Sequence, residues 1–274
     1  MLEIPEAIVI SNQLNQTVRG KKIKSAVANS SPHKFAWYHG NPSEYNVNLT
    51  GKTLGITTAY AGRIEIEIED VLLAFHDGVN LRFFDAASSA PSKHQLFLKF
   101  LDDSCLVATV AMYGGIMCFF EGEMDDNFYH NVSRSSVSPL SDAFDYDYFE
   151  SLFDEESLNM SVKAFLATRQ RIPGLGNGVL QDILLNAKIH PKRKINTLTK
   201  KQRHDIFSGI KLTLAEMINA GGRDTERDLF GNLGEYKTKL SKNNVLMICE
   251  NCGGQVKKES YLGGSIYYCL KCQV

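Results

Sequence analysis

The first half of the chain carries short apolar segments with a two-residue repeat. Residues 63–69 alternate strictly between charged residues and Ile, so one face of a strand lies against a core and the other faces water. Polar turn signals such as Asp77-Gly78 and Asp102-Asp103 separate the apolar segments that follow. These segments cover residues 71–75, 81–84, 95–100 and 105–110. Short strands at this spacing predict an antiparallel sandwich or barrel.

Helical periodicity is found at the N-terminus and again in the second half. Apolar residues at helical spacing predict helices over residues 4–18, around 179–187 and around 206–218. Gly221-Gly222 provides a stop for the last of these helices. Pro191 predicts a turn between the two later helices, because proline cannot continue a helix. The chain therefore changes from strands to helices along its length.

Length and composition limit the class of protein. A chain of 274 residues is long enough for two or three domains. With 43% hydrophobic and 22% charged residues, it is not a mainly disordered, collagen-like or coiled-coil protein. No apolar run reaches the length of a membrane-spanning helix, and the acidic residues 1–6 do not resemble a secretion signal. We therefore expect a cytoplasmic protein without a membrane partner.

Charge is divided unevenly between the two halves. Residues 1–156 hold 11 Lys+Arg and 22 Asp+Glu, whereas residues 157–274 hold 19 and 9, although the formal net charge is only −1. A basic C-terminal half favours a surface for a polyanion. The alternative is that the two halves have solvated surfaces whose charges happen to differ.

Four of the six cysteines form two CxxC pairs near the C-terminus. Cys249 and Cys252 are separated from Cys269 and Cys272 by sixteen residues. Such pairs bring four thiolates to one tetrahedral Zn²⁺, and disulfides are the less favoured alternative in a chain without a secretion signal. Four sulfur ligands leave no open position, so we expect one structural zinc ion. The other two cysteines, Cys105 and Cys118, lie in apolar strands and are predicted to be core residues.

Three features follow one another along the chain: the N-terminal Leu2-Glu3-Ile4-Pro5-Glu6, the loop Ile172-Pro173-Gly174-Leu175-Gly176-Asn177 before a helix, and the four-cysteine finger that ends in Cys272-Gln273. Together and in this order they resemble the formamidopyrimidine-DNA glycosylase / endonuclease VIII family of base-excision repair enzymes. The segment 224–231 and Tyr236 also resemble the family's connection between helices and finger. The resemblance covers essentially the whole chain.

The resemblance implies a multi-domain α+β fold with double-stranded DNA held in a cleft between the halves. We expect an N-terminal antiparallel β-sandwich in residues 1–130 and a linker in 131–156, where residues 132–139 are rich in serine. A helix–two-turns–helix domain is expected in residues 157–234, and a zinc-finger β-hairpin in 235–274. The family also implies a monomer, and binding to damaged DNA implies association with the nucleoid.

The resemblance assigns phosphate contacts to the basic half. Asn177 matches the family's phosphate-binding Asn, at a helix start that follows Gly174 and Gly176, and N–H groups at a helix N-terminus bind anions. An ordinary helix cap is the alternative for Asn177. Candidate contacts that position DNA without reading its sequence are Lys163, Arg169, Arg171, Lys188, Lys192, Arg193, Lys194, Lys257 and Lys258. Each of these side chains is otherwise a solvated surface charge.

The family's chemistry begins at the N-terminus. In the family, the amine of a proline exposed by removal of Met attacks C1′ of the damaged nucleotide, and the next residue, a Glu, moves protons. Glu3 and Glu6 stand where the family has its two glutamates, but Leu2 stands in the place of the proline. The candidate nucleophile is therefore the amine of Met1, or that of Leu2 if Met1 is removed.

Two further positions depart from the family pattern. Arg63 stands where the family has a catalytic or phosphate-binding Lys, and arginine cannot deprotonate to attack a sugar. Gly264 stands where the finger has an Arg that grips DNA. Met112 or Tyr113 is a candidate to fill the gap left by a flipped base, and packing within the sandwich is the alternative. Together these departures predict changed or lost catalysis on a retained scaffold.

Three hypotheses about function follow. The first is a DNA glycosylase for oxidised bases, with or without AP lyase activity. The second is a catalytically inactive binder of damaged or structured duplex DNA. The third is a zinc-stabilised module that binds RNA or protein, which the few aromatic residues near the basic ones disfavour.

Overall fold

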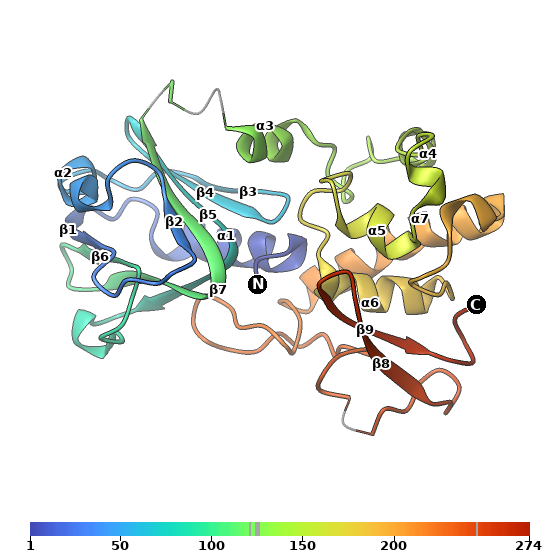
Figure 1. Cartoon of the computed structure of the whole chain (residues 1–274). Coiled ribbons are helices and arrows are strands. Elements are labelled where there is room, and N and C mark those ends of the chain that lie inside the picture. Colours follow the sequence, from blue (N-terminus) through green and yellow to red (C-terminus); the bar gives the residue numbers. More distant parts are fainter. Residues whose placement is uncertain (121, 124–126, 245) are drawn as a thin grey trace. The chain divides into compact units, whose positions relative to one another are not determined.

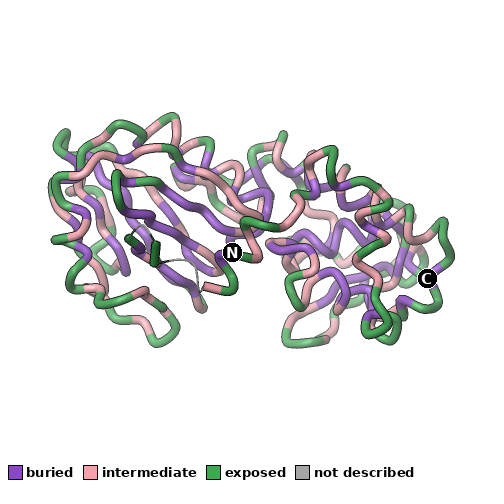
Figure 2. Tube along the Cα trace, turned by 90° about the horizontal axis from the view of Figure 1, so that it is seen from above, coloured by how far each residue is buried: buried purple, intermediate pink, exposed green. Residues whose placement is uncertain are grey.

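The chain folds into two compact units in the computed structural model, which describes residues 1–120, 122–123, 127–244 and 246–274. Unit 1 consists of residues 1–134 and 226–233, and unit 2 consists of residues 135–225 and 234–274. Within the described ranges, no helix is long and apolar enough to cross a membrane. In each unit the buried positions run along its central strands or helices, and the loops are exposed (Figure 2).

Unit 1 begins with α1 (Ile4–Thr17), as predicted, and continues into a seven-stranded sheet (Figure 1). The strands are β1 (Ile23–Ala28), β2 (Ala36–Tyr38), β3 (Thr57–Tyr60), β4 (Arg63–Ile68), β5 (Val71–Phe84), β6 (Leu96–Phe100) and β7 (Cys105–Phe120). Short helices are η1 (Pro42–Glu44), α2 (Tyr45–Leu49), η2 (Ala87–Ser89) and α3 (Phe128–Ser135). The strand order is β1-β6-β7-β5-β4-β3, and all pairs are antiparallel except that of β2 with β7.

The predicted β-sandwich is confirmed, and it is built from strands that are shared by both of its layers. The first half of β5 pairs with the end of β7 and with β4, whereas its second half pairs with the start of β7. The register of the β5–β7 pair shifts between Asp77 and Val79, where Asp77 adopts φ +59°. The sequence predicts a turn at Asp77-Gly78, and this is wrong: the two residues form a bulge inside one long strand, which bends the sheet.

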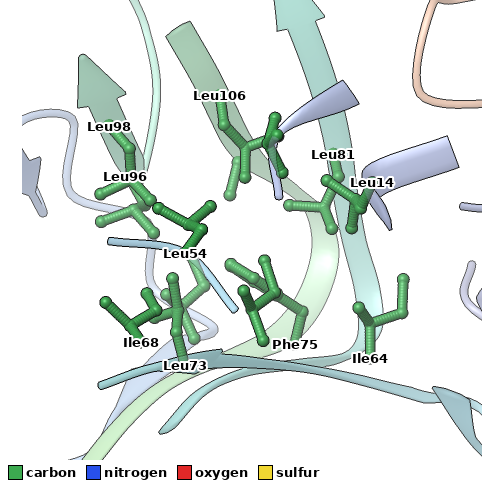
Figure 3. Close-up of a cluster of buried hydrophobic side chains, with 14 of the residues drawn as sticks. Leu14, Leu54, Ile64, Ile68, Leu73, Phe75, Leu81, Leu96, Leu98 and Leu106 are labelled. Carbon is green, nitrogen blue, oxygen red and sulfur yellow. The ribbon is translucent and has the colours of Figure 1, made fainter. Parts of the chain in front are cut away.

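The core of unit 1 lies between the two halves of the bent sheet and is closed by α1. Ile64, Ile66 and Ile68 are fully buried, as their alternation predicts. They join a cluster that includes Leu14, Leu54, Leu73, Phe75, Leu81, Leu96, Leu98 and Leu106 (Figure 3). Cys105 and Cys118 are buried too, and burial raises the pKa of Cys118 to about 12. Their prediction as core residues is confirmed.

Unit 2 is helical and ends in a two-stranded hairpin. Its helices are α4 (Tyr146–Ser151), η3 (Ser157–Asn159), α5 (Val162–Ala167), α6 (Asn177–Asn186), η4 (Ile195–Thr197) and α7 (Lys200–Asn219), and its strands are β8 (Val256–Tyr261) and β9 (Gly264–Cys269). A capping box of Thr199 with Gln202 begins α7. As predicted, α7 ends before Gly221 and Gly222, which take positive φ angles of 65° and 103°.

The range 131–156, which the sequence predicts as a linker, contains packed structure. It holds the end of α3 and all of α4. The buried ring of Phe149 on α4 contacts Phe144, Phe165 and Phe207, with ring centroids 5.9–6.4 Å apart. The aromatic side chains supply apolar area that the serine-rich part of this range lacks. The predicted domain boundaries therefore stay a prediction, and the compact units divide the chain differently.

Candidate nucleic-acid and metal sites

The four cysteines of the two CxxC pairs converge at one end of the β8–β9 hairpin. The four sulfur atoms lie within 4.8 Å of one another. Cys249 Sγ is 3.8 Å from Cys272 Sγ, and Cys252 Sγ is 3.6 Å from Cys269 Sγ. The four predicted ligands are thus brought together in one cluster that could hold a metal ion. Four sulfur donors at this spacing fit a tetrahedral soft metal ion.

The hairpin that carries this site is attached to α6. The Tyr267 amide donates to Gln181 Oε1 at 3.1 Å, and Gln273 Nε2 donates to the Ile189 carbonyl at 3.0 Å. Val256 and Tyr267 pack with Leu185 of α6 in a small apolar cluster. This attachment fixes the hairpin turn relative to the start of α6.

Asn177, Lys163 and Gly264 meet where α6 begins. Asn177 Nδ2 donates to the Ser265 carbonyl at 2.8 Å, and Lys163 Nζ donates to the Tyr261 carbonyl at 2.6 Å. A Cβ placed on Gly264 lies 3.6 Å from Asn177 Nδ2 and 3.7 Å from Lys163 Nζ. Three positions predicted to concern DNA, far apart in the sequence, are therefore neighbours.

The N-terminus of α6 adds the positive end of a helix dipole to this group. Gly176 is its N-cap, with extended φ and ψ and no side-chain cap. The alternative, that Asn177 is an ordinary helix cap, is not supported, because Asn177 is already the first helical residue and its side-chain amide donates to the hairpin. Gly174 takes φ +76°, which lets the loop turn toward the helix. Asn177 Oδ1 is buried and, among the described residues, has no hydrogen-bond partner.

Lys163 differs from the other basic candidates because it is buried, with 3% of its surface exposed. No ion pair found among the described residues includes Lys163. Burial lowers the pKa of Lys163. A buried cation without an opposite charge is costly, so this ammonium group favours an anionic ligand.

The remaining basic candidates are divided between ion pairs and exposed positions. Arg171 Nη2 lies 2.9 Å from both carboxylate oxygens of Asp154, and Arg169 pairs with Glu156. Lys192 Nζ lies 2.7 Å from Glu259 Oε1. Four further residues have no ion pair within the described part of the chain, namely Lys188, Arg193, Lys257 and Lys258. Lys194 Nζ donates to the Asn159 carbonyl at 2.8 Å.

At the N-terminus, position 2 is part of the core of unit 1. The Leu2 side chain is 6% exposed and belongs to the main hydrophobic cluster, and the Leu2 amide donates to the Asp77 carbonyl at 2.6 Å. Glu3 precedes α1 as its N-cap, and both Glu3 and Glu6 are buried. The Met1 amine forms an ion pair of 2.6 Å with Glu226 Oε2, within unit 1.

Arg63 is buried in a network on the outer face of β4. Glu65 lies at the centre of this network and is 1% exposed. Its Oε1 accepts a hydrogen bond from Arg63 Nε at 2.7 Å and lies 2.8 Å from His130 Nδ1. Its Oε2 accepts a hydrogen bond from Arg134 Nη2 at 2.7 Å. Burial lowers the pKa of Arg63, and Glu65 opposes this effect. Arg63 Nη2 is buried and has no hydrogen-bond partner among the described residues. The sequence reasoning missed Glu65, His130 and Arg134, since only tertiary packing brings α3 to β4.

The bend of β7 carries the two candidates for filling a base gap. Met112 is exposed, and Tyr113 is half-buried with its ring centroid 6.1 Å from that of Trp37. His76 and Asp77, on the facing part of β5, form a hydrogen-bonded pair of 2.8 Å. The sequence shows that His76 and Asp77 are adjacent, and a hydrogen-bonded pair could have been predicted from this. The Asp77-Gly78 dipeptide was instead interpreted as a turn.

Comparison with known proteins relates the chain to one family. The formamidopyrimidine-DNA glycosylase H2TH domain family matches residues 136–228. The formamidopyrimidine-DNA glycosylase from Lactobacillus delbrueckii subsp. bulgaricus is 29% identical to this chain, and the match covers 100% of this chain and 99% of the relative. The one from the Wolbachia of Brugia malayi is 26% identical, and the match covers 100% of both chains. Over its whole length the chain is similar to formamidopyrimidine-DNA glycosylases.

Solved structures in this family share the fold over its whole length. The Lactococcus lactis enzyme in complex with DNA that contains an abasic site matches with a TM-score of 0.80 and 24% identity, covering 99% of each chain. The MutM (Fpg) protein from Thermus thermophilus matches with a TM-score of 0.81 and 20% identity, covering 99% of this chain and 98% of that one. The helix–two-turns–helix domain lies in unit 2, and the family's finger is the β8–β9 hairpin with its cysteine cluster.

Proposed function

We propose that this chain is a base-excision repair protein of the DNA glycosylase class that binds duplex DNA at damaged or abasic nucleotides. Its relatives are named formamidopyrimidine-DNA glycosylases, and they align over the full chain. Two of the similar structures are complexes of the Lactococcus lactis protein with abasic DNA. The monomeric state and the association with the nucleoid stay predictions.

The observation that carries DNA binding is the group formed by Lys163, Asn177 and the finger turn. Lys163 is a buried cation without an ion-pair partner in the described residues, and it lies beside the positive end of α6. Helix N-termini and lysine ammonium groups both bind phosphate, so the group supports a contact with the DNA backbone. Such a contact positions the duplex and does not select a base.

We assign one structural Zn²⁺ to Cys249, Cys252, Cys269 and Cys272. Zinc prefers four thiolates in a tetrahedral site, and the sulfur atoms already lie close enough to share one ion. When bound, the ion links the two ends of a hairpin that has only a small apolar cluster of its own. A fully coordinated zinc ion has no open position for catalysis.

The lyase step that uses an N-terminal proline is not expected in this chain. Leu2 stands in the proline's place, its side chain is buried in the core, and its amide is bound to Asp77. A group held in this way cannot move to a sugar carbon without breaking the core packing of unit 1. We therefore propose damage recognition without a Schiff base at position 2.

Two assays on the full-length protein test this proposal. A gel-shift series compares a duplex with a tetrahydrofuran abasic analogue with the same duplex intact, and borohydride is added to a duplex with a natural abasic site. We expect tighter binding to the abasic analogue and no covalent adduct. Equal affinity for both duplexes contradicts damage recognition, and a trapped adduct contradicts the absence of the lyase step.

A catalytically inactive binder is the second candidate function. The observation that favours it is the burial of Arg63, which is tied to Glu65 instead of being presented to a ligand. The absence of an arginine at Gly264 further weakens the grip on DNA. Release of free base from a duplex that carries an oxidised base separates the two candidates, since a pure binder releases none.

A further inference from the structure

His76 and Asp77 form a pair that none of the roles above uses. His76 Nδ1 lies 2.8 Å from Asp77 Oδ2, and the two side chains are 21% and 46% exposed. A proton on Nδ1 is shared with the carboxylate, which leaves the lone pair on Nε2. Among the described residues, Nε2 has no hydrogen-bond partner. The pair is thus oriented by its hydrogen bond, and both side chains are partly exposed.

The His76 ring occupies the space left by the missing side chain of a glycine on the neighbouring strand. His76 on β5 is in register with Gly115 on β7, and a Cβ on Gly115 would clash with His76 Nε2. The ring therefore lies over the glycine. Arg63 on β4 pairs with His76, and Trp37 on β2 pairs with Gly115, so these side chains share one sheet face with the ring. Arg63 Nη2, which is buried and has no hydrogen-bond partner among the described residues, lies on this same sheet face.

Glu3 lies near the same bulge. The Leu2 amide donates to the Asp77 carbonyl at 2.6 Å, which fixes the residue before Glu3 to β5. Burial raises the pKa of Tyr113, and the charges of Asp77 and of Glu3 raise it further. Both carboxylates are therefore close to Tyr113. Glu3 and the His76–Asp77 pair lie around one position of unit 1, and Arg63 and Tyr113 are among the charged or titratable groups beside it in the described residues.

We infer that His76, oriented by Asp77, is the general base of a hydrolytic glycosylase reaction at this site. The inference rests on the proposed function and supplies a mechanism that needs no nucleophile at position 2. A water molecule passes a proton to His76 Nε2 while its oxygen bonds to C1′ of the damaged nucleotide. The bond between C1′ and the base nitrogen breaks, and its electron pair leaves with the base.

The remaining steps balance without another reactant. The imidazolium returns its proton to the departing base, so the products are a free base and an abasic sugar with a 1′ hydroxyl group. The buried Glu3 carboxylate stabilises the positive charge that develops on the sugar in the transition state. No covalent enzyme intermediate forms, and the DNA strand is not cut.

Three variants and one control test the inference in the full-length protein. His76→Gln keeps a polar group but cannot accept a proton, Asp77→Asn weakens the orientation of the ring, and Gly115→Ala displaces it. His94→Gln is the control, because His94 is a half-exposed histidine of unit 1 whose Nδ1 lies 3.1 Å from the Pro91 carbonyl. The substrates are duplexes with 8-oxoguanine, a formamidopyrimidine or 5-hydroxyuracil, and free base is measured in single turnovers.

We expect wild type and His94→Gln to release base from at least one duplex. His76→Gln should be slower by about 100-fold or more, a typical loss for a general base. It should also lack the acidic limb of the pH–rate profile, which a purely structural role does not remove. Affinity for the tetrahydrofuran duplex and the urea midpoint should stay unchanged.

The outcomes separate this inference from the proposed function. If wild type binds none of the duplexes, the proposed function is wrong. If it binds them but releases no base, or if His76→Gln matches wild type in rate and pH profile, the His76 inference is wrong and DNA binding stands. A covalent adduct trapped by borohydride also overturns the hydrolytic mechanism.

Discussion

At the scale of single residues, burial distinguishes Lys163 from the exposed lysines Lys257 and Lys258. The Lys163 ammonium donates to the Tyr261 carbonyl and has no carboxylate partner in the described part of the chain. Desolvation makes such a charge unfavourable in the free protein. A DNA phosphate would supply the missing opposite charge.

Lys163→Met is expected to weaken duplex binding by about 10–100-fold, the range for the loss of one charged hydrogen bond. The slope of log affinity against log salt should fall by about one. Thermal stability should stay equal or rise, because the variant removes an uncompensated buried charge. Lys257→Met, at an exposed position, is the control and should reduce affinity less. Lower thermal stability with unchanged affinity would show that Lys163 is structural.

The pH dependence follows from the same residue. Because burial lowers the pKa of Lys163, this side chain loses its charge before the exposed lysines do as pH rises. The Lys163-dependent part of DNA affinity should therefore decline first on the alkaline side. The free energy of unfolding changes in the opposite direction. Because the unfolded chain holds this proton more tightly, the buried charge of Lys163 destabilises the folded protein less as pH rises.

At the scale of elements, Glu65 connects α3 to β4. It accepts hydrogen bonds from Arg63 and Arg134 and contacts His130, and it is almost completely buried. The sequence shows Glu65 only as one of the polar positions in an alternating strand, which predicts that it faces water. The structure differs because α3 covers this part of the outer face.

Glu65→Gln is expected to destabilise the protein by about 3–5 kcal/mol, because it leaves buried cations without their opposite charge. Glu67→Gln changes an exposed residue two positions along the same strand, and its effect should stay within about 0.5 kcal/mol. Urea unfolding of both variants measures the difference. Equal midpoints would mean that the network adds little to stability.

The β8–β9 hairpin depends on its metal site more than on its apolar contacts. Only a small cluster that includes Val256 and Tyr267 supports it, whereas structural zinc contributes about 10–16 kcal/mol of apparent binding energy. Removal of the metal by a chelator, or Cys249→Ser, should unfold the hairpin, so that trypsin cleaves the backbone after Lys257 and Lys258 while the rest of the chain stays resistant. Zinc should restore resistance to the chelated wild type only. Unchanged cleavage of residues 246–274 without metal would contradict this prediction.

At the scale of the whole molecule, the uneven charge of the chain corresponds only in part to its two units, since unit 1 has a net charge of −5 and unit 2 of +4. Residues 1–156, which include most of unit 1, have twice as many acidic as basic residues. Most of the basic residues lie in unit 2, together with the helix–two-turns–helix domain and the finger. A cationic unit attracts a polyanion over several ångströms, and this attraction weakens as salt is added.

Much of this arrangement was predictable from the sequence alone. The alternation in residues 63–69, the helix periods and the CxxC spacing each depend on neighbours in the chain, so the strands, helices and metal ligands could be placed without coordinates. The motif order also indicated the family. The boundaries were less predictable, since the aromatic residues that order 144–153 find their partners on α5 and α7.

The sequence by itself determined which side chains are present for metal and phosphate binding, and that position 2 holds no proline. Only the tertiary structure decided which of them act together. It buried Lys163 beside Asn177, tied Arg63 to Glu65, and set His76 over Gly115 at a bulge that the local sequence predicts as a turn. The physical reason is that burial, desolvation and register depend on residues far apart in the chain, which no local pattern records.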